Sequence, residues 1–132
     1  MTKTPVYTLK VSETFSAAHR LRGYKGQCEN IHGHNWRVEV ELRYRVLNDI
    51  GIAADFTDVK RLLKTVLSDY DHKDLNELRE FASDNPSAEH IARNIHHKIN
   101  AKAAESGIGV PERIRVSVYE SERSCCSYEE EQ

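Results

Sequence analysis

The chain has 132 residues, of which 39% are hydrophobic and 30% charged, and 19 Lys and Arg against 21 Asp and Glu give a formal net charge of −2. This length suits one domain (1–132), the composition excludes a disordered chain, and no basic stripe indicates nucleic-acid binding. No stretch reaches the roughly 18 apolar residues of a membrane span, and no signal peptide is evident, so we expect a cytoplasmic protein without a membrane partner.

The first half of the chain predicts two strands joined by a loop. Apolar residues alternate with polar ones from Tyr7 to Ala17, and His19 continues the apolar parity. Residues 20–31 contain two glycines and read as a loop that holds Cys28. Strict alternation from 35 to 46 predicts a long second strand. If this strand also extends backwards through Gly33, His32 and His34 lie on the same side as its buried residues.

The second half predicts two helices and then two strands. Apolar residues at helical spacing predict a first helix from about 56 to 69 and a second from Ala88 to about Gly107, after Asn85-Pro86-Ser87. Residues 114–118 alternate as a third strand, and 125–128 form a short fourth. We expect an α+β fold of order ββααββ, an antiparallel four-stranded sheet with both helices on one face. The acidic tail, 129–131, should be frayed.

Three histidines at the ends of the first two strands predict a metal site. His32 and His34 on extended chain would present two imidazoles to one side, and His19 on the neighbouring strand would supply the third. Three protein ligands leave a zinc ion one open position for water or substrate. Two alternatives remain: ordinary loop histidines, or a closed structural site with Cys28 as the fourth ligand.

Other residues suggest proton transfer and ligand binding. Asp71 directly precedes His72 after the first helix, where the carboxylate could orient the imidazole. Glu120 shares the inward parity of the third strand and needs a partner, either a salt bridge within the protein or a ligand with adjacent N–H donors, such as a pterin or guanine edge. The second helix carries three more histidines, which we expect to be solvated or boundary residues: His90, His96 and His97.

Several short motifs occur in a specific order: Phe15-Ser16-Ala17-Ala18-His19, Cys28-Glu29-Asn30-Ile31-His32-Gly33-His34-Asn35, Asp55-Phe56 with Lys60, Leu67 through Asp71-His72 to Leu75-Asn76, Asn85-Pro86-Ser87-Ala88-Glu89, and Tyr119-Glu120-Ser121. Together they resemble the 6-pyruvoyl-tetrahydropterin synthase and 6-carboxy-tetrahydropterin synthase superfamily, which has the tunnelling fold (T-fold). The resemblance covers nearly the whole chain. It departs from the family at residues 122–126, whose pattern we cannot assign.

The resemblance implies a role for each site residue. His19, His32 and His34 would bind Zn²⁺, Cys28 would be the proton-transferring thiol, Asp71 with His72 the second acid/base element, and Glu120 the residue that grips the pterin. It also implies a homohexamer with active sites between subunits. For the triphosphate of the substrate, the loop offers three cations: Arg20, Arg22 and Lys25.

The spacing of Cys28 and His32, with three residues between them, resembles the bacterial 6-carboxy-tetrahydropterin synthases of queuosine precursor biosynthesis. The implied reaction is a lyase-type conversion of 7,8-dihydroneopterin triphosphate to 6-carboxy-5,6,7,8-tetrahydropterin, with release of acetaldehyde and triphosphate. Two rival functions remain. One is elimination of triphosphate to give 6-pyruvoyl-tetrahydropterin, and the other is a non-catalytic module stabilised by zinc.

Overall fold

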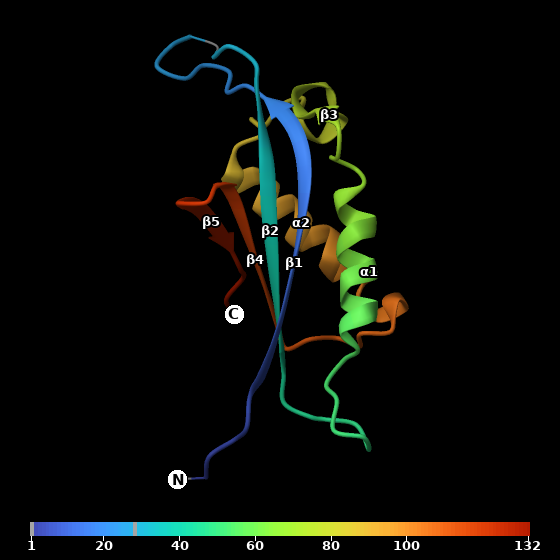
Figure 1. The fold of residues 1–132 in the computed structure, drawn as a ribbon. Helices are drawn as coiled ribbons and strands as arrows, with labels where there is room; N and C mark the ends of the chain where they lie inside the picture. The colour runs from blue at the N-terminus through green and yellow to red at the C-terminus, as the bar shows by residue number, and fades with distance from the viewer. Residues whose placement is uncertain (1, 28) are drawn as a thin grey trace.

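The computed structural model describes residues 2–27 and 29–132. Its elements are, in chain order, β1 (Tyr7–His19), β2 (His32–Tyr44), α1 (Phe56–Leu67), β3 (Lys73–Asp74), α2 (Ala88–Lys102), β4 (Arg113–Ser121) and β5 (Ser124–Tyr128). Both helices pack on one face of the sheet, as predicted (Figure 1). Within the described residues, no helix has both the length and the apolar character needed to cross a membrane.

The sheet has five strands in the order β3-β1-β2-β4-β5, one more than the predicted four. β1–β2, β2–β4 and β4–β5 are antiparallel, whereas β3 contributes two residues that run parallel to the end of β1. The sequence did not predict β3 because two residues are too few to show alternation. Since β3 pairs with only two residues of β1, most of that edge is open, and so is the outer edge of β5. Open edges favour association with further chains.

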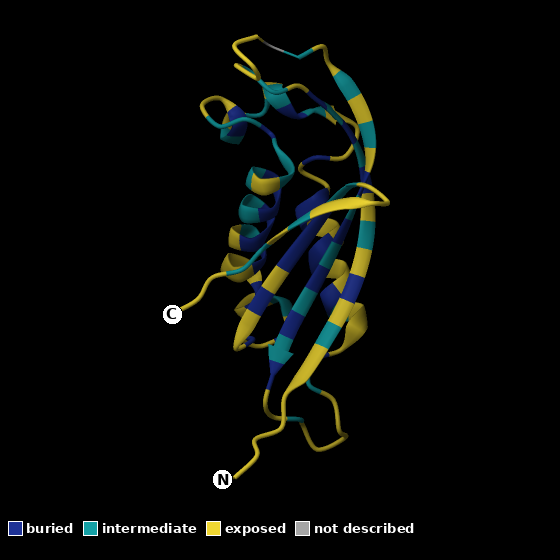
Figure 2. Ribbon diagram, turned by 90° about the vertical axis from the view of Figure 1, so that its left-hand side faces the viewer, coloured by how far each residue is buried: buried dark blue, intermediate teal, exposed yellow. Residues whose placement is uncertain are grey.

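Alternation along the strands builds the core between sheet and helices (Figure 2). The inward side chains of β2 from Trp36 to Leu42 are fully buried, and Phe15 of β1 stacks on Trp36 with ring centroids 5.9 Å apart. Burying a large apolar side chain contributes about 1.5–3 kcal/mol. β2 ends at Tyr44 instead of Val46, which is 78% exposed, because the pairing with β1 ends at Tyr7.

Side-chain caps start both helices. The Asp55 carboxylate accepts a hydrogen bond from the Thr57 N–H, and the Ser87 hydroxyl accepts one from the His90 N–H. These bonds satisfy donors that have no partner inside the helix. The cap at Ser87 places Pro86 directly ahead of α2, close to the end of β1.

Candidate metal centre and active site

The pairing of β1 with β2 brings the three predicted metal-binding histidines together. His19 and His32 are direct partners across the two strands, and His34 lies two residues further along β2 on the same face. Direct cross-strand partners have Cβ atoms only about 4.5–5.5 Å apart. Accordingly, the three ring centroids lie 4.6 to 5.2 Å from one another. The strand parity predicted this convergence correctly.

Backbone carbonyls orient two of the rings. The Nδ1 atom of His19 lies 2.8 Å from the Pro86 carbonyl oxygen, and Nδ1 of His32 lies 2.9 Å from that of Asn30. Because a carbonyl can only accept, each Nδ1 carries the proton and each Nε2 keeps its lone pair. This is the arrangement in which a histidine is ready to bind a metal through Nε2.

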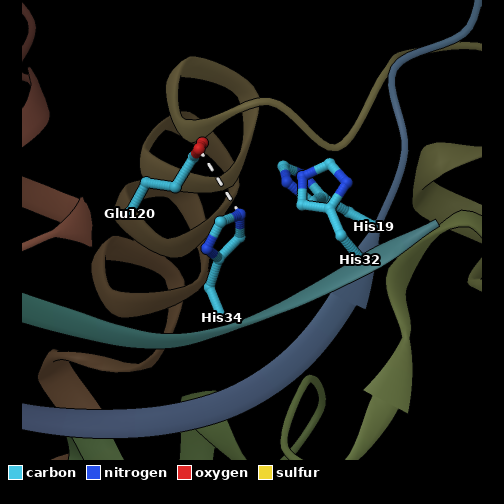
Figure 3. Close-up of side chains that lie close together, drawn as sticks. All are labelled: His19, His32, His34 and Glu120. Atoms are coloured by element: carbon cyan, nitrogen blue, oxygen red, sulfur yellow. Dashed lines mark ion pairs between the residues drawn. The ribbon is translucent and has the colours of Figure 1, made fainter. Parts of the chain in front are cut away.

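The third ring, His34, faces the carboxylate of Glu120 at the end of β4. Its Nε2 lies 3.4 Å from Glu120 Oε1 (Figure 3). Burial lowers the pKa of His34 from its usual value, although Glu120 partly opposes this, and the other two histidines lower the pKa further. A lowered pKa favours the neutral imidazole, which is the form that binds metal.

The four side chains satisfy the geometric requirement of a metal site. One ligand atom from each of His19, His32, His34 and Glu120 lies within 4.8 Å of the others. Buried Nε2 atoms of His19 and His34 also lack a hydrogen-bond partner among the described residues, a costly state that a bound cation relieves. A zinc ion with ligands at about 2.0–2.1 Å holds them roughly 3.3 Å apart in a tetrahedron, so small side-chain movements suffice. The residues present therefore fit Zn²⁺.

Glu120 lies closer to the histidines than the sequence alone predicted. The sequence predicted an inward carboxylate that needs a partner, either a salt bridge within the protein or a ligand, and its contact with His34 is of the first kind. The structure also puts it within the metal-capable cluster, with its side chain 41% exposed. The carboxylate thus stands between the cluster and solvent, where it can contact either a cation or a bound substrate.

Asp71 and His72 form a pair at the edge of the sheet. One carboxylate oxygen of Asp71 accepts the Ser16 N–H at 2.9 Å, and the other lies 3.0 Å from His72 Nδ1. The Ser16 hydrogen bond is the main cause that lowers the pKa of Asp71 below its usual value, with a further contribution from His72. Asp71 is therefore ionised at neutral pH and holds the His72 proton on Nδ1.

The backbone of His72 adopts an unusual conformation to reach this position. Its φ is +61°, in the left-handed region that non-glycine residues seldom occupy, and its N–H donates to the Ser16 carbonyl at 2.6 Å. Backbone strain of this kind is concentrated at functional sites. The His72 side chain is 82% exposed. The sequence predicted the Asp-His pair, but it did not predict that the Ser16 backbone binds both residues, Asp71 through its N–H and His72 through its carbonyl.

Asp71 and His72 do not belong to the metal-capable group, although His72 and His34 line the same surface depression. This depression, of about 460 Å³, lies over residues of β1 and β2 that also include Ser16, Gly33 and Asn35. Ser16 and Asn35 alternate with the core-facing residues Phe15 and Trp36, whereas the metal-capable rings share the core parity. Among the described residues, the atoms that meet within 4.8 Å include neither Asp71 nor His72. Cys28 lies outside the described residues.

The structure revises the role of the loop cation Arg22. Its guanidinium group donates to the carbonyl oxygens of Phe81, Ala82 and Asp84, and to the side chain of Asn85. These bonds tie the loop after β1 to the segment before α2. Arg22 is consequently an anchor of the site's framework, because four of the five N–H donors of its guanidinium group are already engaged within the protein.

Comparison with known proteins agrees with this architecture. Residues 8–131 match the protein family described as 6-pyruvoyl tetrahydropterin synthase. A putative 6-carboxy-5,6,7,8-tetrahydropterin synthase of Archaeoglobus fulgidus is 39% identical over 81% of this chain and 84% of its own. The 6-pyruvoyl tetrahydrobiopterin synthase of Drosophila melanogaster is 31% identical over 97% of this chain and 82% of its own. The structure of Caenorhabditis elegans 6-pyruvoyl tetrahydropterin synthase superposes with a TM-score of 0.81 at 26% identity, covering 99% of this chain and all of that one.

Proposed function

The chain belongs to the 6-pyruvoyl tetrahydropterin synthase family, and we propose that it is a zinc-dependent 6-carboxy-5,6,7,8-tetrahydropterin synthase that acts in queuosine biosynthesis. Its substrate would be 7,8-dihydroneopterin triphosphate, and acetaldehyde and triphosphate would be released. The observation that carries the proposal is the cluster of three imidazoles, two of them held by backbone carbonyls with Nε2 free. Support for the carboxy product comes from the spacing of Cys28 and His32 and from the similarity to the Archaeoglobus fulgidus protein.

His19, His32 and His34 would hold the zinc ion. When bound, zinc supplies a positive charge that polarises substrate oxygens and stabilises negative charge developing beside them. Glu120, which lies next to the cluster and is partly exposed, would accept hydrogen bonds from the adjacent N–H groups of a pterin. A carboxylate with two acceptor oxygens suits a pair of neighbouring donors.

Two groups would move protons. The Asp71 carboxylate keeps the His72 proton on Nδ1, so His72 Nε2 has a free lone pair and can take a proton from the substrate or return one. Cys28, four residues ahead of His32 in the sequence, would serve as the second proton carrier. A thiol near a metal or an imidazolium loses its proton more readily than a free cysteine.

We propose that each active site combines residues from two subunits of a hexamer. Two observations support this arrangement: among the described residues Asp71 and His72 do not belong to the metal-capable group, and the sheet has open edges at β1 and β5. A mixture of His32→Ala and Asp71→Asn chains tests it. If sites are shared, random mixing in equal amounts restores roughly one quarter of the wild-type sites, far more than the activity of either variant alone. If sites are contained within one chain, the mixture is no more active than Asp71→Asn alone.

Product analysis tests the reaction itself. The purified protein is incubated with 7,8-dihydroneopterin triphosphate, and the pterin product and acetaldehyde are quantified. The proposal predicts 6-carboxytetrahydropterin and acetaldehyde in equal amounts. A pyruvoyl product without acetaldehyde would instead assign the chain to triphosphate elimination. His32→Ala should abolish turnover. His90→Ala is the matched control, because His90 also contacts a carbonyl, that of Asn85 at 2.7 Å, but lies outside the histidine cluster.

A non-catalytic zinc module makes a different prediction for Cys28→Ala. If Cys28 carries protons, the variant keeps its zinc and its fold but loses turnover. If Cys28 is a structural ligand, zinc and folded structure are lost together, because a closed site contributes directly to folding. Zinc content by mass spectrometry and circular dichroism distinguish the two outcomes.

A further inference from the structure

A second group of potential metal ligands lies where α2 faces the chain after β5. His96 and His97 are adjacent on α2, and Glu130 follows Tyr128, the last residue of β5. One ligand atom from each of His96, His97 and Glu130 lies within 4.8 Å of the others. Adjacent helical residues normally point in different directions. Here the Tyr128 ring packs against both imidazoles, with centroids 5.1 Å from His96 and 5.8 Å from His97.

His96 differs from what the sequence predicted. It is only 5% exposed rather than a solvated or boundary residue, because it faces β4 and β5 from the buried side of α2. Its Nδ1 is buried and finds no hydrogen-bond partner within residues 2–27 and 29–132. A buried polar atom without a partner costs about 1–3 kcal/mol. The Ile114 backbone interacts with the His96 ring, but the hydrogen bonding of its Nδ1 within the described residues is incomplete.

Glu130 is held in place rather than frayed. Its carboxylate accepts a hydrogen bond from the Tyr128 hydroxyl at 2.6 Å and lies 3.1 Å from Nε2 of His97. Two ligands bonded to one tetrahedral zinc ion at about 2.0–2.1 Å stand roughly 3.3 Å apart. The 3.1 Å between His97 Nε2 and Glu130 Oε2 is close to that spacing, and Tyr128 orients the carboxylate as a supporting residue.

We propose that His96, His97 and Glu130 form a second metal site, for a divalent transition-metal ion of the zinc type. Two imidazoles and a carboxylate are ligands that zinc accepts, with solvent filling the remaining position. His96 contributes the ring nitrogen that lies within 4.8 Å of the ligand atoms of His97 and Glu130. The ion joins α2 to the chain after β5, so its effect is to fix the C-terminal residues and the edge strand that precedes them.

Zinc binding tests this site independently of the first. Protein stripped with a chelator is dialysed against buffered Zn²⁺, and bound metal is measured by mass spectrometry. Wild-type protein should bind about two ions per chain, one at each cluster. Glu130→Gln should weaken one of the two by at least about tenfold, because it removes a charged ligand. Glu129→Gln is the matched control, since it removes the same charge from the neighbouring residue.

Two further variants separate the sites. The double variant His32→Ala with His34→Ala should lose the ion at the histidine cluster and keep the ion at His96, His97 and Glu130. His97→Ala should lose the latter ion and keep the former. The His97 side chain is 54% exposed, so this variant should keep its fold, which circular dichroism checks. The proposal is overturned if Glu130→Gln and Glu129→Gln bind zinc equally well. It is also overturned if wild-type protein binds only one zinc ion per chain and His97→Ala still binds that ion. Either result would show that His97, Tyr128 and Glu130 are only hydrogen-bonded to one another.

Discussion

Asp71→Asn is the sharpest test of the proposed acid/base pair, because it preserves shape and removes charge. In the native chain one carboxylate oxygen accepts the Ser16 N–H and the other faces His72 Nδ1. An asparagine can keep its oxygen on Ser16 only by turning its NH₂ group towards His72. That group donates, so Nδ1 must give up its proton, and Nε2 becomes the protonated atom. The atom that should take a proton from substrate is then blocked.

The size of the effect follows from the exposure of the pair. Positioned acid/base groups contribute about 10²–10⁴-fold to a rate. The His72 side chain is 82% exposed and that of Asp71 43%, so solvent screens their interaction in the single chain. We therefore expect the lower end, a fall in kcat of about 10²-fold, which corresponds to about 2.7 kcal/mol in the activation barrier.

The assay is steady-state turnover of 7,8-dihydroneopterin triphosphate, with zinc content measured on the same samples. Asp71→Asn should lower kcat and leave bound zinc unchanged, since neither residue of the pair lies in the histidine cluster. Asp69→Asn is the control, because Asp69 pairs with Lys98 at 2.9 Å and carries the same charge. Turnover of Asp71→Asn at the wild-type rate would refute the assigned role of the pair.

Three other experiments test contacts that hold the fold together. Burial raises the pKa of Tyr44 to about 12, whereas in the unfolded chain this hydroxyl has its usual pKa near 10. Between these two values the unfolded chain loses a proton that the folded chain keeps, so the free energy of unfolding should fall by about 2–3 kcal/mol from pH 10 to pH 12. Urea unfolding at each pH measures this fall, which should be smaller in Tyr44→Phe. Tyr70 is fully buried and donates to Glu80 at 2.5 Å, so Tyr70→Phe should lower the free energy of unfolding by about 1.5–3 kcal/mol in urea, and no change would contradict a net role for this bond. Arg22→Ala should lower the free energy of unfolding by about 1–3 kcal/mol and weaken zinc binding, because the carbonyls that Arg22 contacts lose their donors. Unchanged zinc affinity would show that the loop is held by other contacts.

The histidine cluster could be predicted from sequence because it depends on strand parity. Once β1 and β2 pair in the observed register, the side on which His19, His32 and His34 lie is fixed. The two main helices and β4 were predictable for the same reason, since apolar periodicity records which face is buried. The predicted order ββααββ is confirmed for the six main elements, whereas β3, which lies between α1 and α2 in the chain, was not predicted.

What the sequence could not predict depends on contacts with backbone or between distant segments. The carbonyls of Asn30 and Pro86, which fix the histidine tautomers, carry no signature in residue type. The burial of His96 results from packing against β4 and β5, and a histidine next to an apolar stripe does not reveal on which side of the boundary it falls. Glu130 was unpredictable because its partner, His97, lies 33 residues earlier in the chain.

Helix α2 links the histidine cluster to the second group of potential metal ligands, so its position affects both. The residue before its N-cap, Pro86, fixes the His19 ring through its carbonyl oxygen, and the same helix presents His96 and His97 to the chain after β5. Glu120 lies at the end of β4, just ahead of β5. A backbone carbonyl cannot be adjusted by side-chain rotation, so its aim depends on where the helix lies. Contacts that fix α2 against β4 and β5 therefore also fix the angle between the His19 ring and the Glu120 carboxylate.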